Sequence, residues 1–527
     1  MKIQSYPRHT FKMYSDQQLK LAENQEALSN FIGLPFNEEN FIQQIQLKKI
    51  HFTLAKRECM VNAFHQQYES IEPVETITNN ISLLALENTF TITTGHQLTL
   101  FGGPSYFMYK ILHVISLCQK LNVKYPAYHF VPVFWMASED HDKEEISETT
   151  IYNKKIRWES TDTGATGNFS LNNEFESCKE EFIRLFSSAE FDEIQQKIQS
   201  FSGNSLAEGM FHFIHAIFQK YGLLILDPNK QILKKEMIPI FEKEINESVT
   251  FKSVSKTNQW LLDQQITPQA QIQPINLFYL QEGKRSKISP SENGFTTNEI
   301  SFTKSQILEE INNHPEFFSP NVFLRPIYQE LILPNLAYVG GPGELNYWMQ
   351  LKGIFDVFSI PYPILVNRVS LFILEKPLLD KFKKFDFSFL DYANFTKEDL
   401  RKTFLLSNKE TIDWTGTQDL IDQAQESAKV LFEKFAPGNA KMVDAEWKSI
   451  EKSVNQLIQK LEKQTNLKYS VSLNQIEQIK DKLFPNGSTQ ERVVHFFQFC
   501  SNGSLKNLDE ILEDINPFES NILLIQV

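Results

Sequence analysis

The sequence predicts an α/β protein whose core is a parallel sheet, followed by an α-helical domain that forms an antiparallel coiled coil. Short apolar runs alternate with helical stretches in the first part of the chain, an order typical of βαβ units. Residues 130–137 are apolar almost throughout, as expected for a parallel strand covered on both faces. Between residues 443 and 461 apolar residues recur at steps of four and three, which indicates a coiled-coil helix.

The first βαβ unit is predicted to begin after a helical flank, for which residues 40–65 have apolar side chains at helical spacing. The β-branched and aromatic segment 89–94 predicts a strand that ends in a Gly-His-Gln turn. A helix is then expected to begin at Pro104, because proline suits the first position of a helix. The apolar strand 130–137 completes the unit.

Two insertions are predicted within the core, one near 150–205 and one near 250–310. The first contains short alternating segments at 155–158 and 164–171, which suggest a small antiparallel sheet. The second is polar and contains Pro, Ser and Asn. Outside the insertions, further core strands are expected at 222–228, 333–339 and 363–369.

The domain boundaries are predicted from where the strand signals stop. The core and its insertions are expected over 1–377, and a helical coiled-coil domain over 378–482. Within that domain a helix over 420–435 is joined to the heptad helix by Ala-Pro-Gly-Asn, a sequence that breaks helices. The segment 483–527 ends in an apolar run and is expected to pack back on the core. A hairpin of this length commonly mediates self-association, so a homodimer is expected.

Composition excludes several classes of function. The formal net charge of the 527 residues is −13, which disfavours nucleic acid as a partner, because phosphate binding needs clustered Lys and Arg. The four cysteines show no CxxC spacing for a structural zinc. The amino-terminal residues are polar, and no stretch has the about 20 apolar residues that a membrane span needs. A cytoplasmic protein without a membrane partner is therefore expected.

Polar side chains follow four of the predicted strands. In an open parallel sheet, ligands bind outside the carboxyl ends of the strands, so these side chains are candidates for one shared site. The candidates are Thr94, Gly95, His96, Gln97, Ser138, Glu139, Asp140, His141, Asp142, Gly340, Gly341, Gly343, Glu344, Asn346 and Arg368, with Gly102 and Gly103 from the turn before the first helix.

The Gly-Gly-Pro sequence occurs twice, at Gly102 and at Gly340, each time before a predicted helix. Backbone N–H groups at a helix start attract phosphate or carboxylate. Neither turn is a P-loop, since no Gly-Lys-Ser or Gly-Lys-Thr follows. A plain tight turn remains the alternative at each position. Glu344, at the start of its helix, could likewise do no more than complement the helix dipole.

The acidic run Glu139–Asp142 could hold a metal, bind an ammonium group or supply a general base. The alternative is a solvated loop that caps the next helix. His96 could contact a substrate or phosphate, or be a satisfied turn residue. Arg368 offers a guanidinium suited to bidentate binding of carboxylate or phosphate, with a surface ion pair as the alternative.

The same motifs give the sequence a resemblance to the BshC family. The resemblance covers essentially the whole chain. At the first motif this sequence has His96 where many relatives have glutamine. The motifs are Thr94–Gln97 with Phe101–Pro104, Val131–Asp142, Leu324–Pro326, Gly340–Trp348, and Leu483–Gly487 followed by Gln490–Arg492.

The resemblance implies a Rossmann-like core, related in shape to class I aminoacyl-tRNA synthetases and nucleotidyltransferases, with two connecting insertions and a coiled coil that dimerises. It implies a ligase that adds L-cysteine to glucosaminyl-malate and so forms bacillithiol. A free carboxylate needs activation before it forms an amide, so ATP or another nucleotide is expected as the activating cofactor. Whether a metal is bound stays open.

By analogy of shape, the resemblance also implies roles for the candidate residues. His96, Asp140 and His141 are expected to be catalytic, and His96, Gln97 and the Gly102–Gly103 turn to face phosphates. The acidic run 139–142 would bind the amine or a metal, and Arg368 a substrate carboxylate or phosphate. Two alternatives remain: a nucleotidyltransferase acting on another small molecule, and a nucleotide-binding scaffold of the thiol pathway.

Overall fold

The computed structural model describes residues 2–23, 25–281, 283–408, 414–500 and 503–527. Its backbone contacts divide the chain into a larger unit, Met1–Leu374 with Thr489–Val527, and a helical unit, Glu375–Ser488. Within the described ranges, no helix combines the length and the apolar character needed to cross a bilayer.

The core of the larger unit is a five-stranded sheet in which every neighbouring pair of strands is parallel, as predicted. The strand order is β14-β13-β2-β3-β6. From β2 the chain runs outward first to β3 and β6, and later on the other side to β13 and β14. The order therefore reverses between β2 and β13, which is where ligands bind in open α/β sheets. The strands are β2 (Thr89–His96), β3 (His129–Met136), β6 (Leu224–Leu226), β13 (Asn335–Gly340) and β14 (Ile364–Asn367).

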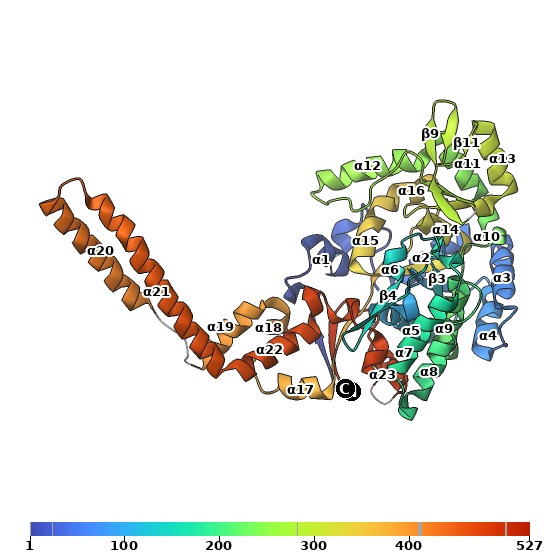
Figure 1. Ribbon diagram of the computed structural model, residues 1–527. Helices are drawn as coiled ribbons and strands as arrows, with labels where there is room; N and C mark the ends of the chain where they lie inside the picture. The colour runs from blue at the N-terminus through green and yellow to red at the C-terminus, as the bar shows by residue number, and fades with distance from the viewer. Residues whose placement is uncertain (1, 24, 282, 409–413, 501–502) are drawn as a thin grey trace. The chain divides into compact units, whose positions relative to one another are not determined.

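Helices cover both faces of this sheet (Figure 1). Successive side chains of a strand point to opposite faces, and β3 shows the consequence. Val131, Val133 and Trp135 pack into a cluster with α3 and α4, whereas Phe134 and Met136 pack with α5 and α9. The helices are α3 (Leu54–Tyr68), α4 (Glu75–Leu84), α5 (Tyr106–Lys124) and α9 (Leu206–Phe218).

Three predicted helices differ in extent from the observed ones. The flank over 40–65 is two helices, because Thr53 leaves the helical conformation and its side chain caps α3. The helix after β2 begins at Tyr106, not at Pro104. The single helix predicted after the Gly-Gly-Pro sequence at Gly340 is split into α15 and α16. The remaining helices of this unit are α1 (Asp16–Glu23), α2 (Asn40–His51), α10 (Gln231–Lys234), α11 (Ile238–Glu247), α14 (Arg325–Ile332), α15 (Pro342–Trp348), α16 (Lys352–Val357) and α23 (Lys506–Asp514).

The first insertion contains the expected antiparallel pair, formed by β4 (Glu148–Ile151) and β5 (Lys154–Arg157). The predicted strand at 164–171 is wrong. This segment instead forms hydrogen bonds with the loop that follows β3. The N–H of Thr166 donates to the carbonyl oxygen of Asp140 at 2.7 Å, and the N–H of Gly167 donates to that of Ser138 at 2.8 Å. The other helices here are α6 (Lys143–Ile146), α7 (Asn173–Arg184) and α8 (Asp192–Gln199).

The second insertion combines helices with two small antiparallel sheets. One sheet has the order β12-β7-β8 and the other β11-β10-β9. The hairpin β7–β8 carries Arg285. The elements are α12 (Val249–Asp263), β7 (Leu277–Gln281), β8 (Lys284–Lys287), β9 (Ser289–Ser291), β10 (Gly294–Thr296), β11 (Ser301–Phe302), α13 (Lys304–Asn313) and β12 (Phe318–Pro320).

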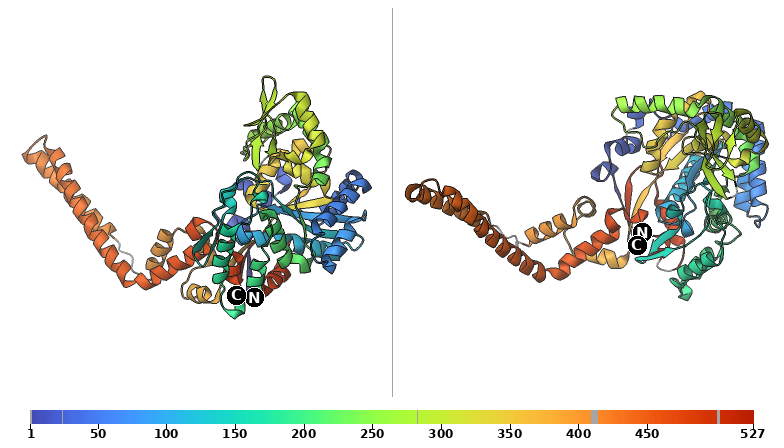
Figure 2. Two further views of the ribbon diagram at one scale, coloured as in Figure 1. Left: turned by 45° about the vertical axis from the view of Figure 1, so that its right-hand side comes forward. Right: turned by 45° about the horizontal axis from the view of Figure 1, so that its top comes forward.

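The two ends of the chain meet in a separate sheet of three strands. β16 (Ile522–Gln526) pairs antiparallel with β1 (Lys2–Tyr6) and parallel with β15 (Ser370–Leu374). The N and C marks accordingly lie together in both views of Figure 2. The apolar run at the end of the chain is thus a buried strand of the larger unit.

The helical unit contains a long antiparallel hairpin of α20 and α21 (Figure 1). Lys429 on α20 pairs with Asp444 on α21 at 2.7 Å. Large apolar side chains stay exposed on the hairpin, among them Leu420, Phe435 and Leu457. Dimerisation through this face stays a prediction. The helices of the unit are α17 (Lys376–Phe382), α18 (Phe389–Asn394), α19 (Lys397–Ser407), α20 (Thr415–Phe435), α21 (Ala440–Lys468) and α22 (Ser470–Leu483).

Candidate active site

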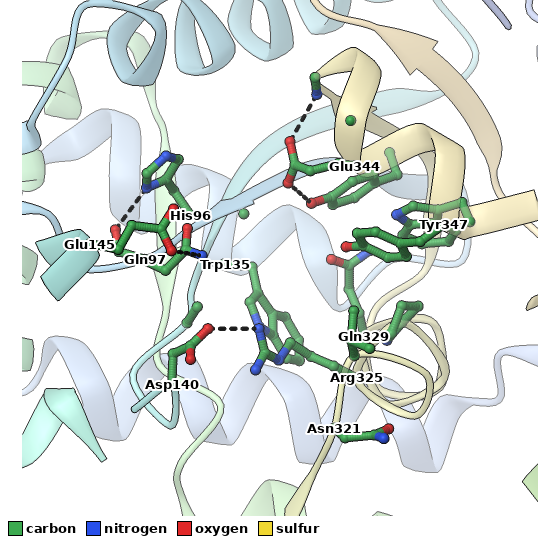
Figure 3. Close-up of a pocket in the computed structure, with 18 of the residues that line it drawn as sticks. His96, Gln97, Trp135, Asp140, Glu145, Asn321, Arg325, Gln329, Glu344 and Tyr347 are labelled. Atoms are coloured by element: carbon green, nitrogen blue, oxygen red, sulfur yellow. Dashed lines mark hydrogen bonds and ion pairs between the residues drawn. The ribbon is translucent and has the colours of Figure 1, made fainter. Parts of the chain in front are cut away.

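A cavity of about 540 Å³ lies at the carboxyl ends of β2, β3, β13 and β14, where the strand order reverses. It brings together segments that are far apart in the sequence (Figure 3). Nine of the predicted site residues line it: Gly95, His96, Gln97, Asp140, His141, Gly341, Gly343, Glu344 and Arg368.

His96 is held as a neutral imidazole of defined tautomer. Its Nδ1 lies 2.9 Å from the carbonyl oxygen of Gln97, and its Nε2 lies 2.8 Å from the hydroxyl of Tyr106. A carbonyl only accepts, so Nδ1 donates and Nε2 accepts the proton of Tyr106. Burial, followed by the nearby Lys110, lowers the pKa of His96 to about 4. At neutral pH this imidazole is therefore a weak base whose two nitrogens already have partners.

Lys110 and Glu344 form an ion pair beside His96. The ammonium of Lys110, on α5, lies 2.5 Å from Glu344 and donates to the carbonyl oxygen of Gly95 at 2.9 Å. Burial alone would raise the pKa of Glu344, but Lys110 and the N–H of Gly341 together hold it below its usual range. Glu344 also accepts from Tyr338 at 3.1 Å. This carboxylate is therefore ionised and fixed.

The loop after β3 places Asp140 and His141 between two arginines. Arg325 approaches Asp140 at 3.6 Å, and Arg285 donates to Nδ1 of His141 at 2.9 Å. Since a guanidinium only donates, that nitrogen of His141 is an acceptor. Burial by itself raises the pKa of Asp140, but His141 and the two arginines hold it well below its usual range. Asp140 is thus a permanent anion rather than a proton acceptor.

Arg368 is buried and already has a carboxylate partner. Its guanidinium donates to Glu491 through two bonds of 2.8 and 2.7 Å, and both side chains are almost fully buried, at 1% and 3% exposed. Of the two alternatives, the ion pair is observed, but it is internal and not on the surface. Only Nε of Arg368 lacks a partner among the described residues.

Four predicted residues at the strand ends do not line the cavity. Thr94 donates to Val339 O at 2.7 Å and so joins β2 to β13. Ser138 donates to Asp227 at 2.5 Å, and Glu139 pairs with the buried Lys234. Asp142 caps α6, as the alternative interpretation of the acidic run expects. The side chains of the acidic run therefore point to different surroundings, and only Asp140 and His141 line the cavity. Within the described ranges, no three His, Cys, Asp or Glu side chains lie close enough together to form a metal site.

Three N–H groups of the predicted anion-binding turns already have acceptors within the protein. Gly102 and Gly103 have φ angles of 85° and 56°, and their N–H groups donate to Thr99 and Leu100 within the turn. The N–H of Gly341 donates to Glu344 at 2.8 Å. The N–H groups of Gly102, Gly103 and Gly341 are therefore already used within the fold. Gly340 and Asn346 lie outside the cavity lining as well.

Several cavity residues were missed by the sequence analysis. Lys110 had a visible signal, since it is the one cation in the otherwise apolar or uncharged stretch 106–118. Arg325 lies in the Leu324–Pro326 motif, but nothing in the sequence around it indicates that its side chain reaches the cavity and Asp140. Arg285 had no signal, because the hairpin that carries it contacts a residue 144 positions away. Also missed were Tyr106, Trp135, Glu145, Tyr338 and Tyr347.

Glu145 differs from the other acids of the cavity. It lies on α6 and accepts from Gln97 at 3.0 Å. Burial, with Asp142 and Asp140 nearby, raises its pKa above the ordinary value. A carboxylate with a raised pKa is a better proton acceptor near neutral pH than one held strongly ionised. The cavity can thus bind anions at its arginines and accept a proton at Glu145.

Comparison with known proteins places the whole chain in one family. Residues 3–369 match the family model "Bacillithiol biosynthesis BshC, N-terminal Rossmann-like domain", and residues 371–527 match the corresponding C-terminal coiled-coil domain. This confirms the predicted Rossmann-like core and coiled-coil domain. A solved structure from Campylobacter jejuni, named as a putative arginyl tRNA synthetase, is 13% identical with a TM-score of 0.18 over 84% of this chain and 92% of that one. A likeness at that level carries no argument.

Curated relatives agree with the family models. "Putative cysteine ligase BshC" of Flavobacterium johnsoniae is 36% identical, covering 93% of both chains. Proteins of the same name from Christiangramia forsetii and Bacillus anthracis are 34% and 26% identical, covering 99% and 92% of this chain and 98% and 92% of their own. The chain therefore belongs to the BshC family of bacillithiol biosynthesis proteins.

Proposed function

We propose that this protein is a ligase that joins the carboxyl group of L-cysteine to the amine of glucosaminyl-malate, which forms bacillithiol. One observation carries the proposal. In a chain that belongs to the BshC family over its whole length, residues from four strand ends line a single cavity. That cavity contains Arg285 and Arg325, which suit an anionic substrate, and the carboxylate of Glu145, which suits the removal of a proton from an amine. Joining a carboxylate to an amine needs both kinds of group.

The reaction forms the C–N bond of an amide while one carboxylate oxygen of cysteine leaves. Oxide is a poor leaving group, so a nucleotide such as ATP is proposed to take that oxygen onto a phosphoryl group. The Gly102–Gly103 turn does not offer donors for its phosphates. Arg285 and Arg325 also line the cavity, and a guanidinium fits an anionic group of a substrate.

The protein's own part in the reaction is to orient the amine and to remove its proton. The hydroxyl of Tyr106 donates a hydrogen bond to His96, so its oxygen can accept a hydrogen bond from an N–H of the incoming amine. Glu145 lies in the same cavity with a raised pKa, and we assign it the role of general base. His96 and Asp140, which the resemblance puts forward as catalytic, then act by positioning, because each is held in one protonation state at neutral pH.

The proposal is tested with purified protein, cysteine, glucosaminyl-malate and candidate nucleotides added one at a time. Bacillithiol is expected by mass spectrometry with one nucleotide and not when either substrate is omitted. Pyrophosphate or phosphate release is measured in parallel. Release that does not depend on cysteine would support a nucleotidyltransferase instead, and an absence of bacillithiol with every nucleotide would contradict the proposal.

Replacement of Glu145 by glutamine is expected to lower kcat about 100-fold or more, because general bases typically contribute at least that factor. The amide keeps the shape of the side chain and can still accept from Gln97, so KM for both substrates should change little. The neighbouring Glu144→Gln is a matched control, since Glu144 is exposed and pairs with Arg157. Equal kcat for the two variants would remove Glu145 from the mechanism.

A further inference from the structure

We infer that Arg325, with Arg285 beside it, binds the dicarboxylate end of the amine substrate and so determines which amine the enzyme accepts. The inference rests on the proposed function, because it assigns the malyl group of glucosaminyl-malate to a place in the same cavity. Arg325 was not among the residues expected to bind substrate, and the role predicted for Arg368 passes to it.

Arg325 has donors to offer. Its side chain is 25% exposed, and within the described residues the carboxylate paired with it is that of Asp140, at 3.6 Å, beyond hydrogen-bond distance. Figure 3 shows the guanidinium facing that carboxylate. Within the described part of the chain its side chain makes no hydrogen bond. A guanidinium carries five N–H donors in a planar fork that matches a carboxylate, and in Arg325 none of them is taken by a hydrogen bond to a side chain or backbone group of the described residues.

Arg285 reaches the same place from the second insertion. Its guanidinium lies 3.7 Å from the centre of the Phe278 ring and donates to Ser319 at 3.2 Å and to His141 at 2.9 Å. It is therefore rigid, yet some of its N–H groups stay uncommitted. Burial and then the charge of Arg325 lower the pKa of Arg285 to about 10. Two guanidinium groups this close repel each other, and a bound anion relieves the repulsion.

The other cations of the cavity are less suited to this task. Lys110 is paired with Glu344, and Arg368 with Glu491. Arg492 is exposed, so its charge is screened by water. Asp140 supplies one negative charge against the two guanidinium groups of Arg285 and Arg325. This corner of the cavity therefore keeps a net positive charge, which favours an anionic ligand.

The chemistry of the two substrates decides which carboxylate binds here. The carboxyl group of cysteine loses its negative charge as the amide forms, so a site built for a permanent anion would oppose that step. The malyl group keeps both carboxylates throughout the reaction. A pair of adjacent guanidinium groups fits two linked carboxylates and holds them without taking part in bond formation.

The test compares two amine substrates, glucosaminyl-malate and glucosamine, which lacks the dicarboxylate. For Arg325→Gln, KM for glucosaminyl-malate is expected to rise about 30- to 100-fold with kcat within about threefold, since one bidentate contact of a charged pair is lost. KM for glucosamine should stay within about twofold. Arg325→Lys should fall between, because it keeps the charge and loses the fork. Arg184→Gln, at an exposed arginine on α7, is the control.

A calorimetric arm separates this inference from the proposed function. Binding of glucosaminyl-malate, and of malate alone, is measured on wild-type protein, Arg325→Gln and Arg285→Gln without nucleotide, with thermal unfolding to confirm that each variant is folded. Affinity lost in folded Arg325→Gln supports the inference even if no ligase activity is found. Unchanged affinity for glucosaminyl-malate, or KM values that rise equally for both amines, would overturn it.

Discussion

Between about pH 7.5 and pH 5.0 the larger unit is expected to lose about 6 kcal/mol of its free energy of unfolding, because three buried histidines stay neutral in the folded state. Burial lowers the pKa of each of His96, His113 and His495 to about 4, from an ordinary value of 6.5. A loss of this size approaches the whole stability of many domains.

The sign follows from which state binds the protons. At about pH 7.5, one unit above the ordinary pKa, the imidazoles are almost fully neutral in both states, so nearly the full stability is present. As the pH falls toward 4, the unfolded chain takes up protons that the folded protein does not, and each imidazole costs about 2 kcal/mol at pH 5. His113 and His495 resist protonation for a local reason. Each accepts a backbone N–H at Nδ1 while Nε2 donates to a carbonyl, so a proton on Nδ1 would break a bond.

Denaturant unfolding at several pH values measures this dependence, and His495→Gln provides the comparison. Glutamine can keep both hydrogen bonds without titrating, so the variant should lose about a third less stability between pH 7.5 and 5.0 than the wild-type protein. Carboxylates with lowered pKa values, such as Glu491, act mainly below this range. An identical pH dependence for the two proteins would show that His495 is protonated in the folded state.

The parallel sheet could be predicted because its signal is local. A strand covered on both faces is apolar at every position, and 130–137 shows this without any information on its partners. The ends of the strands could also be predicted from local sequence. Because ligands bind at the carboxyl ends of parallel strands, Gly95, Asp140 and Gly341 were expected in one site, and they line one cavity. The predicted strand at 164–171 failed because Gly167 packs against the backbone of Ser138, a contact that no local pattern encodes.

The partners of charged side chains could not be predicted, because they depend on distant parts of the fold. Arg368 and Glu491 are 123 residues apart in the sequence, and nothing near Arg368 indicates that it is already paired. The prediction that the Gly102 turn binds an anion was wrong for another reason. Its sequence resembles that at Gly340, but Gly102 and Gly103 have positive φ angles and their N–H groups donate to carbonyl oxygens within the turn. The same three residues, Gly-Gly-Pro, thus adopt two backbone geometries, since Gly341 has a φ of −76°.

Replacement of Glu491 by glutamine is expected to lower the free energy of unfolding of the larger unit by about 3–5 kcal/mol, because it leaves the charge of Arg368 buried without a partner. The carboxylate accepts two bonds from Arg368 and a third from the N–H of Leu371 at 3.2 Å. It therefore ties the returning carboxyl-terminal segment to the start of β15. Glu180→Gln, in an exposed pair with Arg184, should change the stability by less than about 0.5 kcal/mol.

Removing both charges separates the cost of an unpaired ion from the value of the pair. The double variant Arg368→Met, Glu491→Leu should recover most of the loss measured for Glu491→Gln, since buried ion pairs often contribute little beyond well-packed apolar side chains. Arg368 also lies 5.1 Å from the ring of Tyr106, so the double variant reports on the cavity as well. If it keeps the KM for glucosaminyl-malate, Arg368 serves the fold and substrate binding belongs to other arginines. A double variant no more stable than Glu491→Gln would mean that packing around Glu491, and not an orphaned charge, explains the loss.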